Sequence, residues 1–187
     1  MKKLQFALFI GLGLLLGSCS GAKNAEANAE GFGQIEKEMK SKFGDNAYYT
    51  QINISYDKRM GNMISTTVTD APESLGMGEW TNLQGVWNQT SEVTIELPEG
   101  TKATDFMFQL GDKISLTKMG ELVEESMKSL TKEKGIENPV LDGAYIKYPD
   151  NGDISKAQYS IMLEPENGGT TFSYYYNLDG SFDRMNY

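Results

Sequence analysis

The chain has 187 residues, of which 17 are basic and 26 are acidic, so its formal charge at neutral pH is −9. This acidic balance argues against nucleic acid and anionic lipid headgroups as ligands. The chain contains no histidine and only one cysteine, which excludes histidine-based catalysis, histidine metal ligands and an internal disulfide.

The first residues have the order of a secretion signal. Lys2 and Lys3 precede an uncharged apolar run from Phe6 to Leu16, which is shorter than the roughly 20 residues of a transmembrane helix. The run ends at Leu16-Gly17-Ser18-Cys19, which resembles the lipobox of bacterial lipoprotein precursors. The resemblance implies a thioether-linked diacylglycerol on Cys19, cleavage before this residue and acylation of the new amine. The alternative is an ordinary signal peptide with an unrelated cysteine beside the cleavage site.

The mature protein would begin at Cys19 and would carry 15 basic and 26 acidic residues, a formal charge of −11. Two or more acyl chains anchor a protein stably to a membrane. A lipidated Cys19 also leaves no thiol for catalysis or for a zinc site. Residues 19–30 are small and polar, which predicts a flexible tether. Ser20 follows the cysteine, with no aspartate there, and by analogy with the lipoproteins this favours the outer membrane, on a face that the sequence does not define.

The first half of the remaining chain begins with a predicted amphipathic helix from Gly31 to Gly44. An alternating strand follows, with one side formed by Tyr48, Ile52, Ile54 and Tyr56. Further strands are predicted at Ile64 to Thr69, Glu79 to Trp87 and Val93 to Leu97.

The second half has the same plan. A helix is predicted from Ser115 to Lys134, with Gly135 as its C-terminal cap. Alternating strands follow, whose inward positions are Ala144, Ile146, Tyr148, Tyr159, Ile161, Leu163, Phe172, Tyr174 and Tyr176. A hairpin at Leu178 to Ser181 leads to a last strand from Phe182 to Tyr187.

The two halves also share short stretches of sequence. Met39-Lys40-Ser41 matches Met127-Lys128-Ser129, and Trp87-Asn88 matches Tyr176-Asn177. The members of these two matches are 88 and 89 residues apart. Either an old duplication or a coincidence of similar elements explains them.

The aromatic strand and Asp-Gly hairpin from Phe172 to Ser181 resemble the PepSY-like domains of bacterial envelope proteins. Two such units in tandem resemble the architecture of β-lactamase-inhibitory protein, in which helices cover one face of a sheet and the other face binds a protein. The resemblance implies an α+β fold of two helix-plus-antiparallel-sheet units, at residues 31–110 and 111–187. No binding residue transfers from that family to this chain.

The outward positions of the second sheet provide the candidate site. If the helix covers Ile146 and its neighbours, then Tyr145, Met162 and Tyr175 point away from it. Tyrosine and methionine are enriched in protein interfaces, so these residues predict a surface for an envelope protein or a peptide. Trp80 is a candidate extension of this surface. The alternative is that the same side chains only stabilise the sheet through cross-strand packing.

No catalytic residue, metal site or cofactor is predicted, and the sequence does not define an oligomeric state. The first hypothesis is a non-enzymatic lipoprotein that binds another envelope protein or a peptide. The alternatives are a glycan hydrolase that uses a carboxylate pair and a purely structural envelope lipoprotein.

Overall fold

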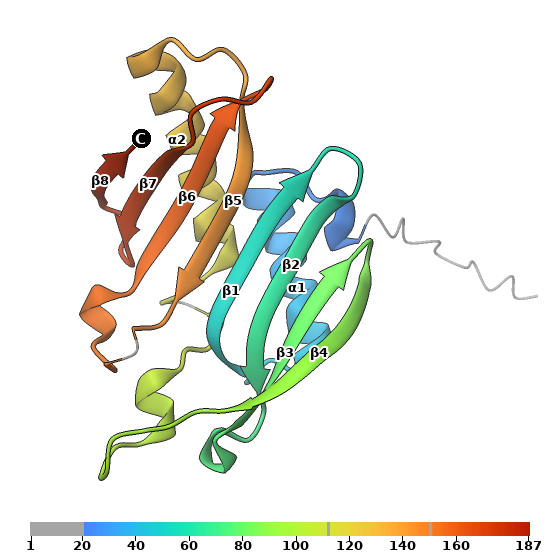
Figure 1. Ribbon diagram of the computed structural model, residues 1–187, viewed down its shortest axis with the longest axis vertical. Coiled ribbons are helices and arrows are strands. Elements are labelled where there is room, and N and C mark those ends of the chain that lie inside the picture. The colour runs from blue at the N-terminus through green and yellow to red at the C-terminus, as the bar shows by residue number, and fades with distance from the viewer. Residues whose placement is uncertain (1–20, 112, 150) are drawn as a thin grey trace, which may run out of the picture.

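The computed structural model describes residues 21–111, 113–149 and 151–187. The signal segment and Cys19 lie outside the described residues, so lipidation stays a prediction. The described part is an α+β fold with two α-helices and one eight-stranded antiparallel sheet (Figure 1). Neither of these helices has the length and apolar character needed to cross a membrane.

The sheet has the strand order β4-β3-β2-β1-β5-β6-β7-β8. Its strands are β1 (Tyr48–Asp57), β2 (Gly61–Thr69), β3 (Gly76–Leu83), β4 (Val86–Thr94), β5 (Pro139–Lys147), β6 (Gln158–Pro165), β7 (Phe172–Asn177) and β8 (Phe182–Asn186). Strand β1 pairs with β5 at the centre, with Asn53 opposite Tyr145. The strands of both halves therefore form a single continuous sheet, and the expected pair of units is confirmed only as far as the α+β class.

Both helices begin and end close to the predicted residues. Helix α1 (Ala29–Phe43) is capped by Asn28, whose side chain accepts a hydrogen bond from the Gly31 amide at 2.8 Å. Helix α2 (Leu116–Lys134) is capped by Ser115 and ends at Gly135, whose φ of 69° is the left-handed conformation that glycine favours.

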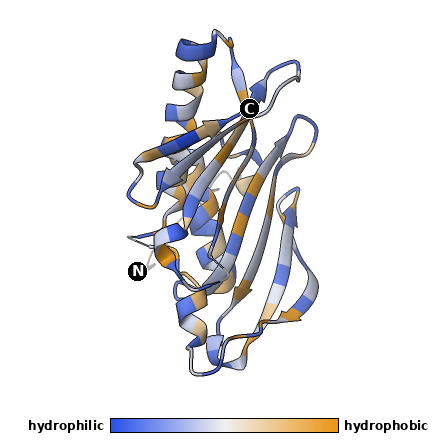
Figure 2. Ribbon diagram, turned by 60° about the vertical axis from the view of Figure 1, so that its left-hand side comes forward, coloured by the Kyte–Doolittle hydropathy of each residue, from blue (hydrophilic) through white to orange (hydrophobic). Residues whose placement is uncertain are grey.

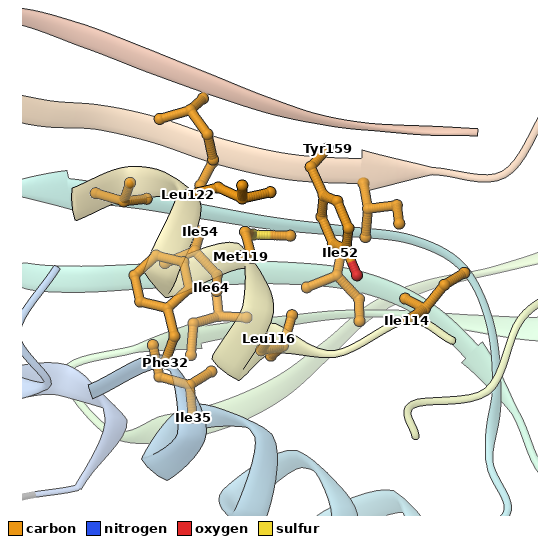
Figure 3. Close-up of a cluster of buried hydrophobic side chains, with 14 of the residues drawn as sticks. Phe32, Ile35, Ile52, Ile54, Ile64, Ile114, Leu116, Met119, Leu122 and Tyr159 are labelled. Atoms are coloured by element: carbon orange, nitrogen blue, oxygen red, sulfur yellow. The ribbon is translucent and has the colours of Figure 1, made fainter. Parts of the chain in front are cut away.

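The two helices pack side by side on one face of the sheet (Figures 1 and 3). The inward residues predicted from the alternating pattern of the second half are all buried in this core, and Phe32 and Ile35 of α1 are fully buried beside them. Figure 2 shows the hydrophobic and hydrophilic residues alternating along the strands. Among the described residues, no α-helix packs on the opposite face of the sheet, and the segment around the 3₁₀ helix Ala103–Phe106 covers only its end beside Met77.

Each helix also caps the other. The Glu36 side chain of α1 accepts a hydrogen bond from the Leu116 amide, at the start of α2, at 2.8 Å. The Glu124 side chain of α2 accepts one from the Ala29 amide, at the start of α1, at 3.2 Å. A carboxylate at a helix N-terminus satisfies a free amide and interacts favourably with the helix dipole. This reciprocal arrangement fixes the register of the two helices.

Two strand predictions are wrong in their bounds. Gln84 and Gly85 both have positive φ values, 55° and 82°, and form the turn between β3 and β4. The predicted strand from Glu79 to Trp87 ran through this turn, because glutamine at the first turn position lacks the usual Asn-Gly signal. The predicted strand from Val93 to Leu97 also ends early, at Thr94, and Ile95 and Leu97 pack instead on a small cluster around Met77 and Met107.

The first strand has an irregularity that shifts its facing. The register breaks between Tyr49 and Gln51, so Tyr49 is buried in the core and not Tyr48. At the other end of β1, Tyr56 is 44% exposed. Of the four residues predicted to lie on one side of this strand, only Ile52 and Ile54 are buried together in the core.

The predicted tether is partly structured. Residues 22–24 form a short 3₁₀ helix, and Ala22 is 1% exposed. The buried Asn62 side chain donates to the carbonyl oxygens of Ala22 and Ala25 at 2.8 and 2.7 Å. Residues 21–28 are therefore packed against β2, which their polar composition did not indicate.

Candidate protein-binding face

The face of the sheet opposite the helices brings three of the four predicted surface residues together. Tyr145 on β5 lies opposite Ser160 on β6, which lies opposite Tyr175 on β7. Ser160 is only 4% exposed, although no helix covers this face. The two flanking tyrosines therefore shield it, and they form a continuous surface across three strands.

Met162 lies one pleat away on the same face. It is paired with Gly143 on β5 and with Ser173 on β7. A Cβ atom on Gly143 would lie 2.8 Å from the methyl carbon of Met162. The glycine thus leaves the space in which the Met162 side chain lies. We call Tyr145, Met162 and Tyr175, together with Arg184 of the neighbouring strand β8, the aromatic surface.

Arg184 on β8 completes this surface, and the sequence analysis did not select it. Its guanidinium lies 3.9 Å from the centre of the Tyr175 ring. The guanidinium also donates to the Gln158 side chain at 3.1 Å and pairs with Asp183. Hydrogen bonds from Gln158 and Arg184 lower the pKa of the Asp183 carboxyl. The sequence predicts the last strand but assigns no facing to Arg184, and nothing in the sequence pairs it with Tyr175.

Trp80 does not belong to this surface. It pairs with the buried Thr66 and packs on the helix-covered face, with its ring 5.5 Å from that of Phe43. The Lys42 ammonium lies over the same ring. The expectation that Trp80 extends the surface is therefore wrong. The error arose because the turn at Gln84 was not recognised, so the sequence did not define which residues of β3 point toward the helices.

The row of side chains that contains Tyr145 and Tyr175 changes character in the β1–β4 half of the open face, where the apolar side chains Met63, Leu83 and Val86 lie in the adjoining row. The row that contains Tyr145 and Tyr175 continues through Asn53, Ser65, Thr81 and Asn88. These side chains are small and polar, and they offer little apolar area to a partner.

The edges of the sheet are poor sites for strand addition. Strand β4 carries Asn88, Gln89, Thr90, Ser91 and Glu92, and its register with β3 is interrupted beside Trp80. Strand β8 has five residues and includes an acid and an arginine. Short, polar and irregular edge strands discourage pairing with another chain. Recognition by a partner is therefore better placed on the open face.

Several of the described carboxylates support turns or helix ends. The pKa values of Asp57, Asp153, Asp179 and Asp183 are lowered by hydrogen bonds, whereas a catalytic acid needs a raised one. Glu26 and Glu30 line one small cavity of about 220 Å³. No cluster of three potential metal ligands occurs among the described residues.

Comparison of the chain with protein-family models, with curated proteins and with solved structures gave no match.

Proposed function

We propose that this protein is a lipid-anchored, non-enzymatic component of a bacterial cell envelope that binds another envelope protein or a peptide through the aromatic surface. The observation that carries the proposal is the clustering of Tyr145, Met162 and Tyr175 on three adjacent strands, on the face that the two described α-helices leave open. Tyrosine, methionine and arginine are the residue types enriched at protein interfaces.

The aromatic surface has features that favour binding beyond its composition. Arg184 is held against Tyr175 by its bonds to Gln158 and Asp183, so its position is set before a partner arrives. A side chain that is already ordered loses less conformational entropy on binding. Tyrosine and arginine also provide most of the strong energetic contributions in measured interfaces.

We also propose that the two halves are tandem units of the PepSY-like type. Glu36 and Glu124 have equivalent capping roles and are separated by 88 residues, the same spacing that relates Met39 to Met127. The third strands of the two halves make equivalent links to the helices. Asn82 donates to Glu38 at 2.8 Å, and the hydroxyl groups of Tyr176 and Ser126 are 2.8 Å apart.

The strand register supports this correspondence and corrects one sequence match. Asn82 pairs with Trp87 in the first half, and Tyr176 pairs with Phe182 in the second. Trp87 therefore corresponds to Phe182, and the match of Trp87-Asn88 to Tyr176-Asn177 is wrong. Tandem helix-plus-sheet units with one open face are the architecture for which the resemblance implies protein binding.

The binding proposal is tested by affinity capture from a detergent extract of the native envelope. The bait is the full chain, and it is compared with a variant carrying Tyr145→Ser, Met162→Ser and Tyr175→Ser. The matched control carries Asn53→Ala, Thr81→Ala and Asn88→Ala on the polar half of the same face. We expect one protein to be retained by the unmodified chain and by the control but lost by the first variant. Equal retention by all three baits would refute the proposal.

The anchoring proposal rests on the Leu16-Gly17-Ser18-Cys19 motif and is tested separately. Cells that express the full chain are labelled with an alkyne-bearing palmitate. We expect label on the protein and none on the Cys19→Ser variant. Label that persists in the variant, or that is absent from the unmodified chain, would contradict lipidation at Cys19.

A further inference from the structure

A cavity of about 580 Å³ opens at the end of the sheet where the N-terminal segment meets the β1–β2 turn. Its lining comes from residues 23–27, from the turn around Lys58 and Arg59, from the start of β5 and from Met127 of α2. Cavities of roughly 300–1,000 Å³ are typical of small-molecule sites. This cavity is separate from the aromatic surface, which lies on the open face of the sheet.

The cavity gathers positive charge on an acidic protein. Lys23, Lys58 and Arg59 line it, with Glu26 as the single acidic residue of the lining. The Glu26 carboxylate already accepts a hydrogen bond from Asn28 at 2.9 Å. The lining therefore has an excess of two positive charges in a chain whose formal charge is −9.

In the part of the chain that the structure describes, no hydrogen bond or salt bridge pairs these cations with an acidic side chain. The charge of Arg59 interacts with the nearby Asp57 carboxylate and, after the backbone hydrogen bonds from Met60 and Arg59, helps to lower the pKa of that group. The Lys58 ammonium donates to the backbone carbonyl of Glu166 at 2.9 Å, which orients the side chain without neutralising its charge. Among the described residues, the Lys23 ammonium and the Arg59 guanidinium form no hydrogen bond and no salt bridge. Their donors are available to an anion.

Apart from Asn24, Tyr56 and Gly61, the rest of the lining is apolar. Ala25, Ala27, Met127, Pro139, Val140 and Leu141 contribute to the same cavity. Three cations in a cavity with apolar lining residues favour a ligand that joins an anionic group to an apolar body, because each part then contacts its complement.

The walls of the cavity are held in place by the fold. Asn62 fixes the N-terminal segment through Ala22 and Ala25. Gly61 has a φ of 76°, and a Cβ atom there would lie 2.4 Å from the Lys23 carbonyl oxygen. On the other side, the Asp57 carboxylate accepts hydrogen bonds from the Arg59 and Met60 amides, which fixes the turn. A preformed site reduces the cost of binding.

A second cavity, of about 440 Å³, lies beside the start of β1 and carries no such charge. Its lining includes one cation, Lys113, and one acid, Asp45. The excess of positive charge is therefore particular to the first cavity, and Lys113 offers a matched control position.

We propose that the cavity bounded by Lys23, Lys58, Arg59, Met127 and Leu141 binds a small organic anion with an apolar body. The cations would hold a carboxylate or phosphate group, and the apolar wall would hold the remainder.

The test uses the full chain in a constant concentration of nonionic detergent, with the methionine methyl groups labelled for NMR. Phenylbutyrate is the anionic probe, phenylbutanol is its neutral counterpart, and both are titrated while the Met127 methyl signal is followed. We expect phenylbutyrate to shift this signal at a concentration about tenfold lower than phenylbutanol requires, because only the acid can accept charge-assisted hydrogen bonds.

The variant with Lys23→Gln and Arg59→Gln should lose this tenfold preference and should still bind phenylbutanol, which shows that the cavity is intact. The Lys113→Gln control should keep the preference. Equal affinity for acid and alcohol in the unmodified chain, or a preference that survives in the double variant, would overturn the proposal. So would a ligand-induced shift confined to methionines outside the cavity.

Discussion

The two halves of the sheet are alike on the face that the helices cover and different on the face that they leave open. Under the helices, Ile54 and Ile146 are both fully buried. On the open face, the row runs through Asn53, Ser65, Thr81 and Asn88 in one half and through Tyr145, Ser160, Tyr175 and Arg184 in the other. The same strands form the covered face and the open face. The two halves therefore meet the same packing requirement under the helices, and this requirement does not account for the difference between them on the open face. The proposed binding role of the aromatic half rests on this difference.

The largest predicted effect concerns the covered face. Ile54→Ala and Ile146→Ala each remove a side chain that is 0% exposed, and each should lower the free energy of unfolding by about 3 kcal/mol. Asn53→Ala and Tyr145→Ala, on the open face, should each cost less than about 1 kcal/mol. Urea unfolding of the four variants measures this. A near-neutral Ile146→Ala would show that the two halves do not contribute equally to the core.

The next comparison is between glycines of the two helices. A Cβ atom on Gly120 would lie 2.3 Å from the Asn28 carbonyl oxygen, in the backbone of the segment before α1. Gly120→Ala should therefore destabilise the protein by about 2 kcal/mol. A Cβ atom on Gly33 would meet only the Thr117 hydroxyl, at 2.9 Å, which can rotate away.

Gly33→Ala should thus be within about 1 kcal/mol of neutral, because the helix propensity of alanine offsets the contact. Thermal unfolding of both variants checks the pair. Equal losses would mean that the helices do not approach as closely at Gly120 as described.

A smaller effect concerns two buried tyrosine hydroxyls, one in each half. The Tyr176 hydroxyl is hydrogen-bonded to Ser126, so Tyr176→Phe should cost about 1 kcal/mol. The Tyr49 hydroxyl is buried and finds no hydrogen-bond partner in the described part of the chain, and burial raises the pKa of this group. Tyr49→Phe should leave the stability unchanged or raise it. A loss in Tyr49→Phe as large as that in Tyr176→Phe would contradict this difference.

The smallest effect is a pH dependence at the β7–β8 turn. Hydrogen bonds from the Ser181 hydroxyl and amide lower the pKa of the Asp179 carboxyl below its usual 3.8. A lowered folded-state pKa contributes stability above the unfolded-state value, and this contribution is lost as the pH falls through the folded-state value. Asp179→Asn should therefore be slightly less stable than the unmodified chain at about pH 7, and the difference should vanish at about pH 2 in urea titrations. A difference that persists at the lower pH would have another cause.

The sequence was most informative where the chain is periodic. Both helices, the C-terminal cap of α2 at Gly135, and the inward positions of β5, β6 and β7 follow from local pattern. Features that depend on contacts distant in sequence were missed. They include the burial of Ala22 through Asn62, the pairing of β1 with β5, and the stacking of Arg184 on Tyr175. Of the four residues predicted for the open face, Tyr145, Met162 and Tyr175 lie there, because alternation alone decides which face they occupy. The fourth, Trp80, lies on the other face, because the turn that begins at Gln84 was not recognised.

The central claim is that the aromatic half of the open face contacts a partner and the polar half does not. Photo-crosslinking in intact cells tests it most directly, with benzoylphenylalanine placed at position 145 or 175 in one pair of strains and at position 53 or 81 in another. We predict a discrete crosslinked product from positions 145 and 175 and none from positions 53 and 81. Products from both halves alike, or from the polar half alone, would contradict the claim.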